Sequence, residues 1–151
     1  MKITSKVLFI LALLSAVSCS VSVKPGYIEA DKKTTEQAIE RFHERFNATQ
    51  YLDIYNDAHE NFKGSQKQAD SFNAMKQTYE HFGRAEQVEE KWLNVIIGAP
   101  IQIRAVYNTK FEKGDATESF IFIKEGDTVK LALYQINPGK VRPEPKQNSK
   151  L

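Results

Sequence analysis

Apolar residues recur at helical spacing through the first half of the chain. Ala38, Phe42 and Phe46 lie four residues apart and predict a helix with one apolar face. Thr34 and Gln37 precede them with the spacing of a capping box, in which side chains satisfy the free N–H groups of a helix start. We therefore expect the first helix to begin at Thr34.

Two more helical runs follow before the pattern changes. The first covers 51–62 and the second covers 65–82, where Ser65 and Gln68 again have capping-box spacing. Gly83 suits the position just after a helix, because glycine tolerates the left-handed conformation that often ends one. The sequence therefore predicts three helices.

From residue 86 onward the apolar residues alternate with a period of two, which predicts strands. Gly98 and Pro100 separate the first strand from the second. Two Gly-Asp pairs, at 114–115 and 126–127, have the glycine-first order of a two-residue type II′ hairpin turn. Four antiparallel strands are expected.

The turns fix the strand register, so they also fix the face of each residue. The expected opposite pairs are Thr109–Phe120 and Tyr107–Phe122 across the first turn, and Phe122–Leu131 and Phe120–Leu133 across the second. One face then collects Ile101, Ile103, Ala105, Tyr107, Phe111, Phe120, Phe122, Val129, Leu131 and Leu133. Two separately placed turns thus give one coherent apolar face.

The opposite face is more apolar than contact with water requires, since it carries Val106, Ile121, Ile123, Ala132 and Tyr134. Such a patch is typical of an interface, so a homodimer or an envelope protein partner is one interpretation. The other is that β-branched residues simply suit strands.

Helices followed by antiparallel strands give an α+β fold, with three helices packed on a four-stranded curved sheet. The stretches "YLDIYNDAHENFKGS" and "VYNTKFEKGDATESFIFIKEGDTVKLALYQI" resemble the nuclear transport factor 2-like (cystatin-like) superfamily. The resemblance covers roughly 34–137 and implies a cone, in which the sheet curls around a long helix. The chain is similar to small bacterial lipoproteins and secreted proteins of that fold, and this resemblance implies no catalytic motif.

The first 18 residues have the order of a secretory signal peptide. Lys2 and Lys6 precede the apolar run 7–14, and small residues lead to Cys19, the single cysteine. The run is too short to span a bilayer, which takes roughly 20 residues. One cysteine also excludes an internal disulfide and a cysteine-based zinc site.

The segment "AVSC" resembles the lipobox of bacterial lipoproteins, in which the cysteine begins the mature chain and carries the lipid. Ala16 stands where leucine is usual, while Ser18 fits the pattern. Acylated Cys19 would then anchor the protein in the cell envelope, and Ser20 favours the outer membrane by resemblance to Gram-negative sorting. The alternative is ordinary cleavage, which leaves a free cysteine in a secreted or periplasmic protein.

The charge balance argues against a nucleic-acid partner. The chain has 21 basic and 19 acidic residues, and removal of Lys2 and Lys6 leaves a neutral mature protein. We expect residues 20–33 to be a tether, 34–137 the domain and 138–151 a disordered tail.

A ligand pocket inside the cone would be lined by aromatic residues, which are Tyr51, Tyr55, Trp92, Tyr107, Phe120 and Phe122. The competing interpretation is that these side chains fill the core. His43, His59 and His81 stand beside acidic residues and are expected at the surface, as is Asp53. No spacing indicates a catalytic set, a metal site or a cofactor.

The sequence therefore favours a non-enzymatic envelope lipoprotein that binds a protein partner or a small apolar ligand. One alternative is a small enzyme of isomerase, dehydratase or hydrolase type, which requires a pocket with a buried acid or histidine among the aromatics. Another is an inhibitor-like protein that caps a partner.

Overall fold

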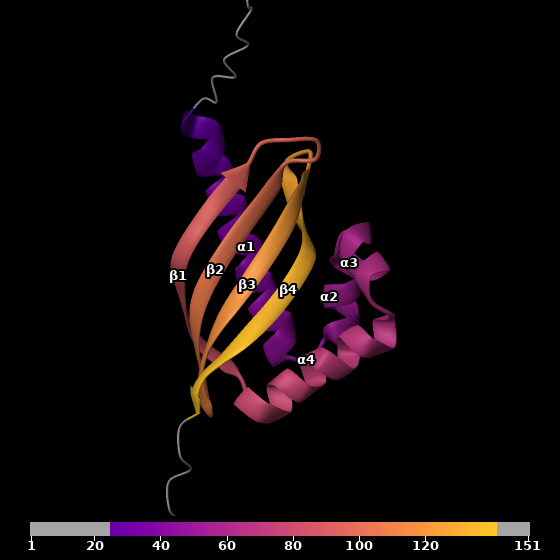
Figure 1. The fold of residues 1–151 in the computed structure, drawn as a ribbon, viewed down its shortest axis with the longest axis vertical. Helices are drawn as coiled ribbons and strands as arrows, with labels where there is room; N and C mark the ends of the chain where they lie inside the picture. The colour runs from indigo at the N-terminus through magenta and orange to yellow at the C-terminus, as the bar shows by residue number, and fades with distance from the viewer. Residues whose placement is uncertain (1–24, 142–151) are drawn as a thin grey trace, which may run out of the picture.

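Helix α1 (Pro25–Asn47) runs along one face of a four-stranded antiparallel sheet (Figure 1). The computed structural model describes residues 25–141, with side chains described for 29–139. The strands are β1 (Ala85–Ile96), β2 (Gln102–Phe111), β3 (Gly114–Glu125) and β4 (Thr128–Val141), and they lie in sequence order across the sheet. This arrangement confirms the predicted α+β class.

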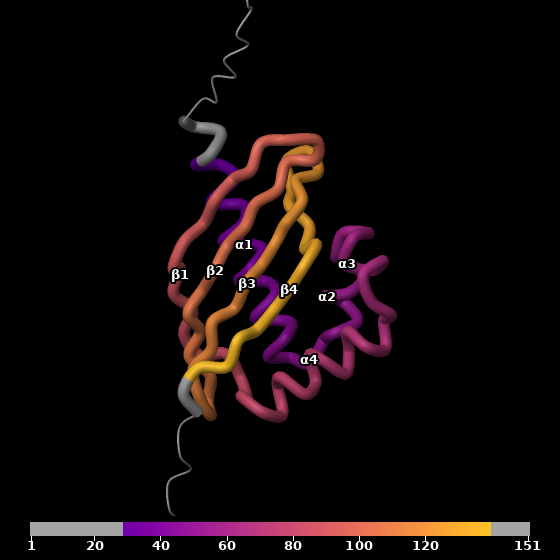
Figure 2. The backbone as a smooth tube through the Cα atoms, in the orientation of Figure 1, coloured from indigo at the N-terminus to yellow at the C-terminus, as the bar shows by residue number. Residues whose placement is uncertain are grey.

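Three shorter helices lie beside the β4 edge of the sheet, as the tube in Figure 2 shows. They are α2 (Tyr51–Asp57), α3 (Glu60–Ser65) and α4 (Gln68–Phe82). The described chain thus has four helices rather than three, because the predicted run 51–62 is broken at Ala58 and His59. The His59 backbone N–H donates to the Leu131 carbonyl at 2.8 Å, so β4 holds the break in place.

Helix α1 begins earlier than predicted. Its first residue is Pro25, which has no N–H and therefore suits a first helical turn. The hydroxyl groups of Thr34 and Thr35 donate to the carbonyls four residues before them, as side chains inside a helix do. The predicted capping box at Thr34 is therefore wrong, and 25–33 belong to the helix rather than to a tether; 20–24 lie outside the described residues.

Of the two predicted ends of α4, the start is wrong and the end is confirmed. The predicted capping box at Ser65 is wrong, because the Ser65 hydroxyl donates to the Phe62 carbonyl and Lys67 is the residue before the helix. The predicted end at Gly83 is confirmed: Gly83 has φ +76° and its N–H donates to the Tyr79 carbonyl at 2.7 Å. A Cβ at Gly83 would lie 2.9 Å from the Glu112 Cβ, and the positive φ is strained for any other residue, so this position favours glycine.

The first hairpin turns two residues earlier than predicted. Phe111 pairs with Gly114, so Glu112 and Lys113 form the turn. Their backbone N–H groups donate to Arg84 and Phe82 carbonyls, which ties the turn to the end of α4. The whole register therefore moves by four residues; Thr109 faces Ala116 instead of Phe120. Because four is even, each residue keeps its predicted face.

The second hairpin turns where predicted, with Glu125 opposite Thr128 and Phe122 opposite Leu131. A bulge then inserts one residue into β4, so Phe120 faces Tyr134 rather than Leu133. Beyond this bulge, each residue of β4 lies on the face opposite to the predicted one. Tyr134, predicted on the outer face, packs against the core, and Leu133 lies opposite Ile121 instead.

Strand β4 also extends further than predicted. Pro138 pairs with Ala116 and Val141 with Gly114, so 138–141 continue the sheet and are not part of a tail. Residues 142–151 lie outside the described residues. No helix in the described part of the chain has the length and apolar character needed to cross a bilayer.

The hydrophobic core lies between α1, the three short helices and the inner face of the sheet. Its most buried large side chains include Phe46, Phe111 and Phe120. The outer face has no helix over it among the described elements (Figure 1). There Trp92 is 45% exposed and Val106, Ile121 and Ala132 are half-buried, whereas Ile123 is buried and offers no contact surface. A contact on this face stays a prediction.

Candidate functional site

Glu118 of β3 is a carboxylate wholly inside the domain, with no exposed surface. Its Oε1 accepts a hydrogen bond from the Tyr134 hydroxyl at 2.7 Å. Its Oε2 accepts from the Thr109 hydroxyl and lies 2.8 Å from Nε2 of His43. A buried charge is costly unless such donors surround it, so these four side chains form one polar unit within the core.

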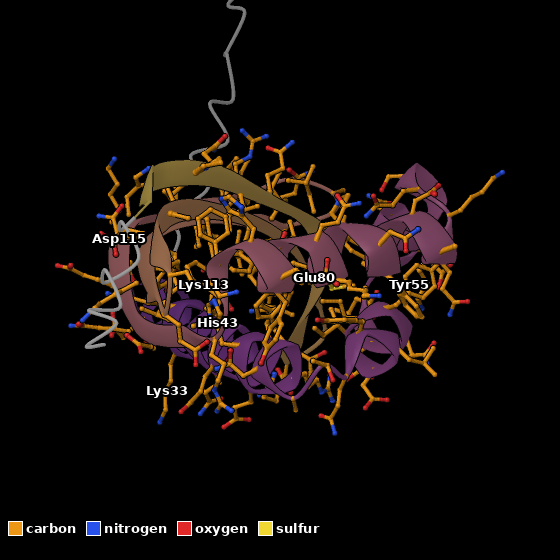
Figure 3. All side chains as sticks on the ribbon, turned by 90° about the horizontal axis from the view of Figure 1, so that it is seen from below. Lys33, His43, Tyr55, Glu80, Lys113 and Asp115 are labelled. Carbon is orange, nitrogen blue, oxygen red and sulfur yellow. The ribbon has the colours of Figure 1, made fainter. Side chains whose placement is uncertain are left out.

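His43 of α1 is 6% exposed and lies where the helix faces the sheet (Figure 3). Since a carboxylate only accepts, we assign the ring proton to Nε2, which leaves Nδ1 as an acceptor in the neutral ring. Nδ1 is buried and has no hydrogen-bond partner. The prediction of a surface histidine was wrong. Helical spacing could have indicated that His43 is buried, because Thr35, Ile39 and His43 lie four residues apart and are all buried.

A cavity of about 450 Å³ opens between α1 and the first two strands, beside His43. We call it the acidic pocket. Its lining residues are Glu36, Ile39, Glu40 and His43 of α1, Ala85, Glu86, Val88 and Glu90 of β1, and Tyr107 of β2. The lining thus combines four carboxylates with apolar side chains such as Ile39 and Val88.

The second buried polar atom of this wall is the Tyr107 hydroxyl, on a side chain that is 5% exposed, and the Glu90 carboxylate is an acceptor beside it. Burial raises the Tyr107 pKa well above its usual range, and the nearby Glu90 and Glu36 carboxylates raise it further. The hydroxyl is therefore a neutral donor at every physiological pH. With its proton directed toward Glu90, its oxygen can still accept, as can Nδ1 of the neutral His43 ring, so the wall has two buried acceptors.

The rim of the acidic pocket has an excess of negative charge. Lys32 is the nearest cation, with Nζ 3.9 Å from a Glu36 oxygen and 3.7 Å from a Glu90 oxygen. Glu40 and Glu86 have no cation within ion-pair distance among the described side chains. Within 29–139, no three histidine, cysteine or acidic side chains are arranged to hold a metal ion.

The aromatic residues predicted to line one pocket are instead spread through the structure. Phe120 and Phe122 are buried in the core, and Tyr51 and Tyr55 pack α2 against it. Trp92 lies on the outer face, opposite Val106. Of the predicted set, Tyr107 alone reaches the acidic pocket.

The remaining candidate residues have separate places. His81 and Asp53 are exposed, as predicted. His59 is half-buried; its Nδ1 accepts from the Asn61 N–H at 3.0 Å, which caps α3, and its Nε2 lies 3.5 Å from Glu125. Cys19, the predicted lipid attachment point, lies outside the described residues.

Neither a protein-family model nor a curated protein sequence matches the chain. Among solved structures, the fold is similar to that of Bd1075 from Bdellovibrio bacteriovorus, with a TM-score of 0.52 and 11% sequence identity. The match covers 78% of this chain and 44% of that one, so the chain spans less than half of the other protein. At this identity the likeness concerns the fold alone.

Proposed function

We propose that this protein is a lipid-anchored envelope protein whose nuclear transport factor 2-like domain binds a small amine-bearing ligand in the acidic pocket. The observation that carries the proposal is Nδ1 of His43, a buried acceptor without a hydrogen-bond partner among the described residues, on a side chain of the pocket wall, with the Tyr107 hydroxyl oxygen as a second buried acceptor. An unsatisfied buried polar atom costs about 1–3 kcal/mol, and a bound ligand that pairs with it recovers this cost.

The acidic rim determines the charge of the ligand. An amine cation near Glu40 and Glu86 gains attraction from two carboxylates that have no other cation. Its apolar body would lie against Ile39 and Val88. A wholly apolar ligand, one of the two kinds of partner that the sequence favoured, would leave Nδ1 of His43 unpaired and is therefore the poorer fit.

Binding requires a small rearrangement. Nδ1 of His43 and the Tyr107 hydroxyl have almost no exposed surface, so a ligand reaches them only when side chains around them move. Glu40 and Glu86 are exposed and have no ion pair with a described side chain, so these two side chains could turn aside as the ligand enters. The polar unit around Glu118 stays fixed and holds the imidazole in one orientation.

The His43–Glu118 pair also supports a second candidate function, a small enzyme that removes a proton from its substrate. A carboxylate on one ring nitrogen orients the imidazole and makes the other nitrogen a better base. The pair lies among aromatic rings, with Phe42 and Phe120 edge-on to the imidazole. In this case His43→Gln would abolish turnover while leaving ligand binding within a few-fold.

The binding proposal is tested with three matched probes, benzylamine, benzyl alcohol and benzoate. We expect benzylamine to bind most tightly and benzoate not to bind, as measured by isothermal titration calorimetry. Tyr107→Phe removes the hydroxyl oxygen, which would accept a hydrogen bond from the ammonium group, and should weaken benzylamine binding roughly tenfold, as expected for one lost hydrogen bond. Glu86→Gln should weaken it as well.

The matched control for these variants is Asp53→Asn, which removes an exposed carboxylate on α2, away from the pocket lining. It should leave benzylamine affinity unchanged. Equal affinity for benzylamine and benzoate in the wild-type protein would contradict the proposal, as would an equal loss from Asp53→Asn and Glu86→Gln.

The anchor is tested at Cys19. Cys19→Ala should move the protein from the membrane fraction to the soluble fraction and abolish labelling by a fatty-acid analogue, because the thiol is the attachment atom. Cys19→Ser, which keeps the size of the side chain, should behave the same way. Labelling that persists in either variant would show that the lipid is attached elsewhere or that the label is not specific.

A further inference from the structure

A second cavity lies on the other side of α1, between that helix, α2 and the start of β4. Its volume is about 280 Å³, which is near the lower end of the range for ligand pockets. Its floor is apolar and includes the buried side chains of Phe42, Ile54 and Leu131. Its rim carries the cations Arg41, Arg45 and Lys130. We call it the basic pocket.

The three cations differ in how their charge is balanced. Arg45 donates to an Asp57 oxygen at 2.5 Å, and Lys130 lies 3.1 Å from a Glu125 oxygen. Arg41 is exposed and has neither an ion pair nor a hydrogen bond to any described residue. A guanidinium without a described partner therefore lies at the mouth of a cavity that has an apolar floor and a polar rim, in which Asp57 also takes part.

Helix α1 places opposite charges on its two flanks. Glu36 and Glu40 line the acidic pocket, whereas Arg41 and Arg45 line the basic pocket. This separation follows from helical spacing, because residues four apart share a flank. The two cavities share no lining residue, so the same small ligand would not suit both.

We infer that the basic pocket binds a small free amphiphile with one carboxylate group. The alkyl chain would be buried against Phe42, Ile54 and Leu131, and the carboxylate would pair with Arg41. Guanidinium and carboxylate groups match each other with two parallel hydrogen bonds, which fixes the head of the ligand. The apolar floor favours a hydrocarbon chain over a second charged group.

This site is independent of the proposed function, because it uses other residues and the opposite ligand charge. Loss of benzylamine binding would leave the basic pocket unaffected, and loss of carboxylate binding would leave the acidic pocket unaffected. The two proposals can therefore fail separately.

The test uses three probes of equal chain length, octanoate, octanol and octylamine. The protein is the full chain with Cys19→Ala, which has no thiol to acylate and so needs no detergent that would compete for the pocket. We expect octanoate to bind at least tenfold more tightly than octanol, and octylamine to bind more weakly still. Methyl signals of Ile54 and Leu131 should shift on octanoate addition in a methyl NMR titration.

Two arginine variants separate the site from general surface charge. Arg41→Ala should weaken octanoate binding about tenfold while leaving octanol binding unchanged, because the chain contacts remain. Arg104→Ala removes an exposed arginine from the outer sheet face and should change neither. Arg41→Lys keeps the charge and should retain part of the affinity.

Three results would overturn the inference. The first is equal affinity for octanoate and octanol in the parent protein. The second is an equal loss from Arg41→Ala and Arg104→Ala. The third is a set of methyl shifts confined to Ile39 and Val88 of the acidic pocket, which would place the carboxylate on the wrong side of α1. Since Arg41 is exposed, its variants should keep the parent melting temperature, and this is checked before each titration.

Discussion

Replacing Glu118 by leucine is expected to lower the free energy of unfolding by about 3–5 kcal/mol. The substitution leaves the hydroxyl groups of Thr109 and Tyr134 and the Nε2 of His43 buried without their acceptor. Each loses a hydrogen bond that water cannot replace, because Glu118 is fully buried. Urea denaturation followed by circular dichroism measures the change.

Matched variants show whether the loss comes from the hydrogen bonds. Glu118→Gln keeps an acceptor oxygen and a similar volume, so it should cost less than leucine. Adding Thr109→Val and Tyr134→Phe to Glu118→Leu removes two stranded hydroxyls and should restore part of the stability. Glu44→Leu, at an exposed position of α1, is the surface control. Equal costs for Glu118→Leu and Glu44→Leu would show that the polar unit does not stabilise the fold.

Above pH 10 the domain is expected to lose stability steeply, because tyrosines with a raised pKa, above all Tyr107 and Tyr134, ionise in the unfolded chain before they ionise in the folded one. Burial, followed by the Glu90 carboxylate, raises the pKa of Tyr107. Burial, followed by the Glu118 carboxylate, raises the pKa of Tyr134. The ordinary pKa of tyrosine is about 10.

The direction in which stability changes with pH follows from proton binding. Above pH 10 the unfolded chain binds fewer protons than the folded chain, so the free energy of unfolding falls as pH rises. The stabilisation is complete below pH 10 and is lost as pH rises toward the folded pKa values. Each tyrosine contributes a slope of about 1.4 kcal/mol per pH unit in this window, so the two together contribute about 2.8.

The alkaline loss is measured by urea denaturation between pH 8 and 11.5. The double variant Tyr107→Phe/Tyr134→Phe should show a shallower fall than the wild-type protein, since phenylalanine does not ionise. Tyr55→Phe removes a tyrosine from α2 and serves as the control for the substitution itself. If the double variant and the wild-type protein fall with the same slope, ionisation of these two side chains is not the cause.

Much of the sheet could be predicted because strand alternation has a period of two. The first turn was placed two residues too late, yet Tyr107 and Phe120 kept their predicted face, since a register change of four residues preserves the alternation. The bulge in β4 could not be predicted in this way. It adds a single residue, and one residue is enough to move Tyr134 from the outer face to the core.

The site was harder to predict because its parts are far apart in the sequence. His43 and Glu118 are 75 residues apart, and neither belongs to a recognisable motif. The helical spacing of Ile39, His43 and Phe46 was a usable signal for burial of the histidine. Nothing in the sequence singled out Glu118, although it stands two residues before Phe120 and shares its buried face.

The sequence by itself determined the α+β class, the inner face of the sheet, the end of α4 at Gly83 and the second hairpin turn. These features depend on periodicity and on glycine, which act over a few residues. The tertiary structure alone decided the start of α1, the first turn, the bulge and the site. Each of these depends on contacts between distant segments, such as α1 with β3 at His43 and Glu118, and such contacts leave no periodic trace in the chain.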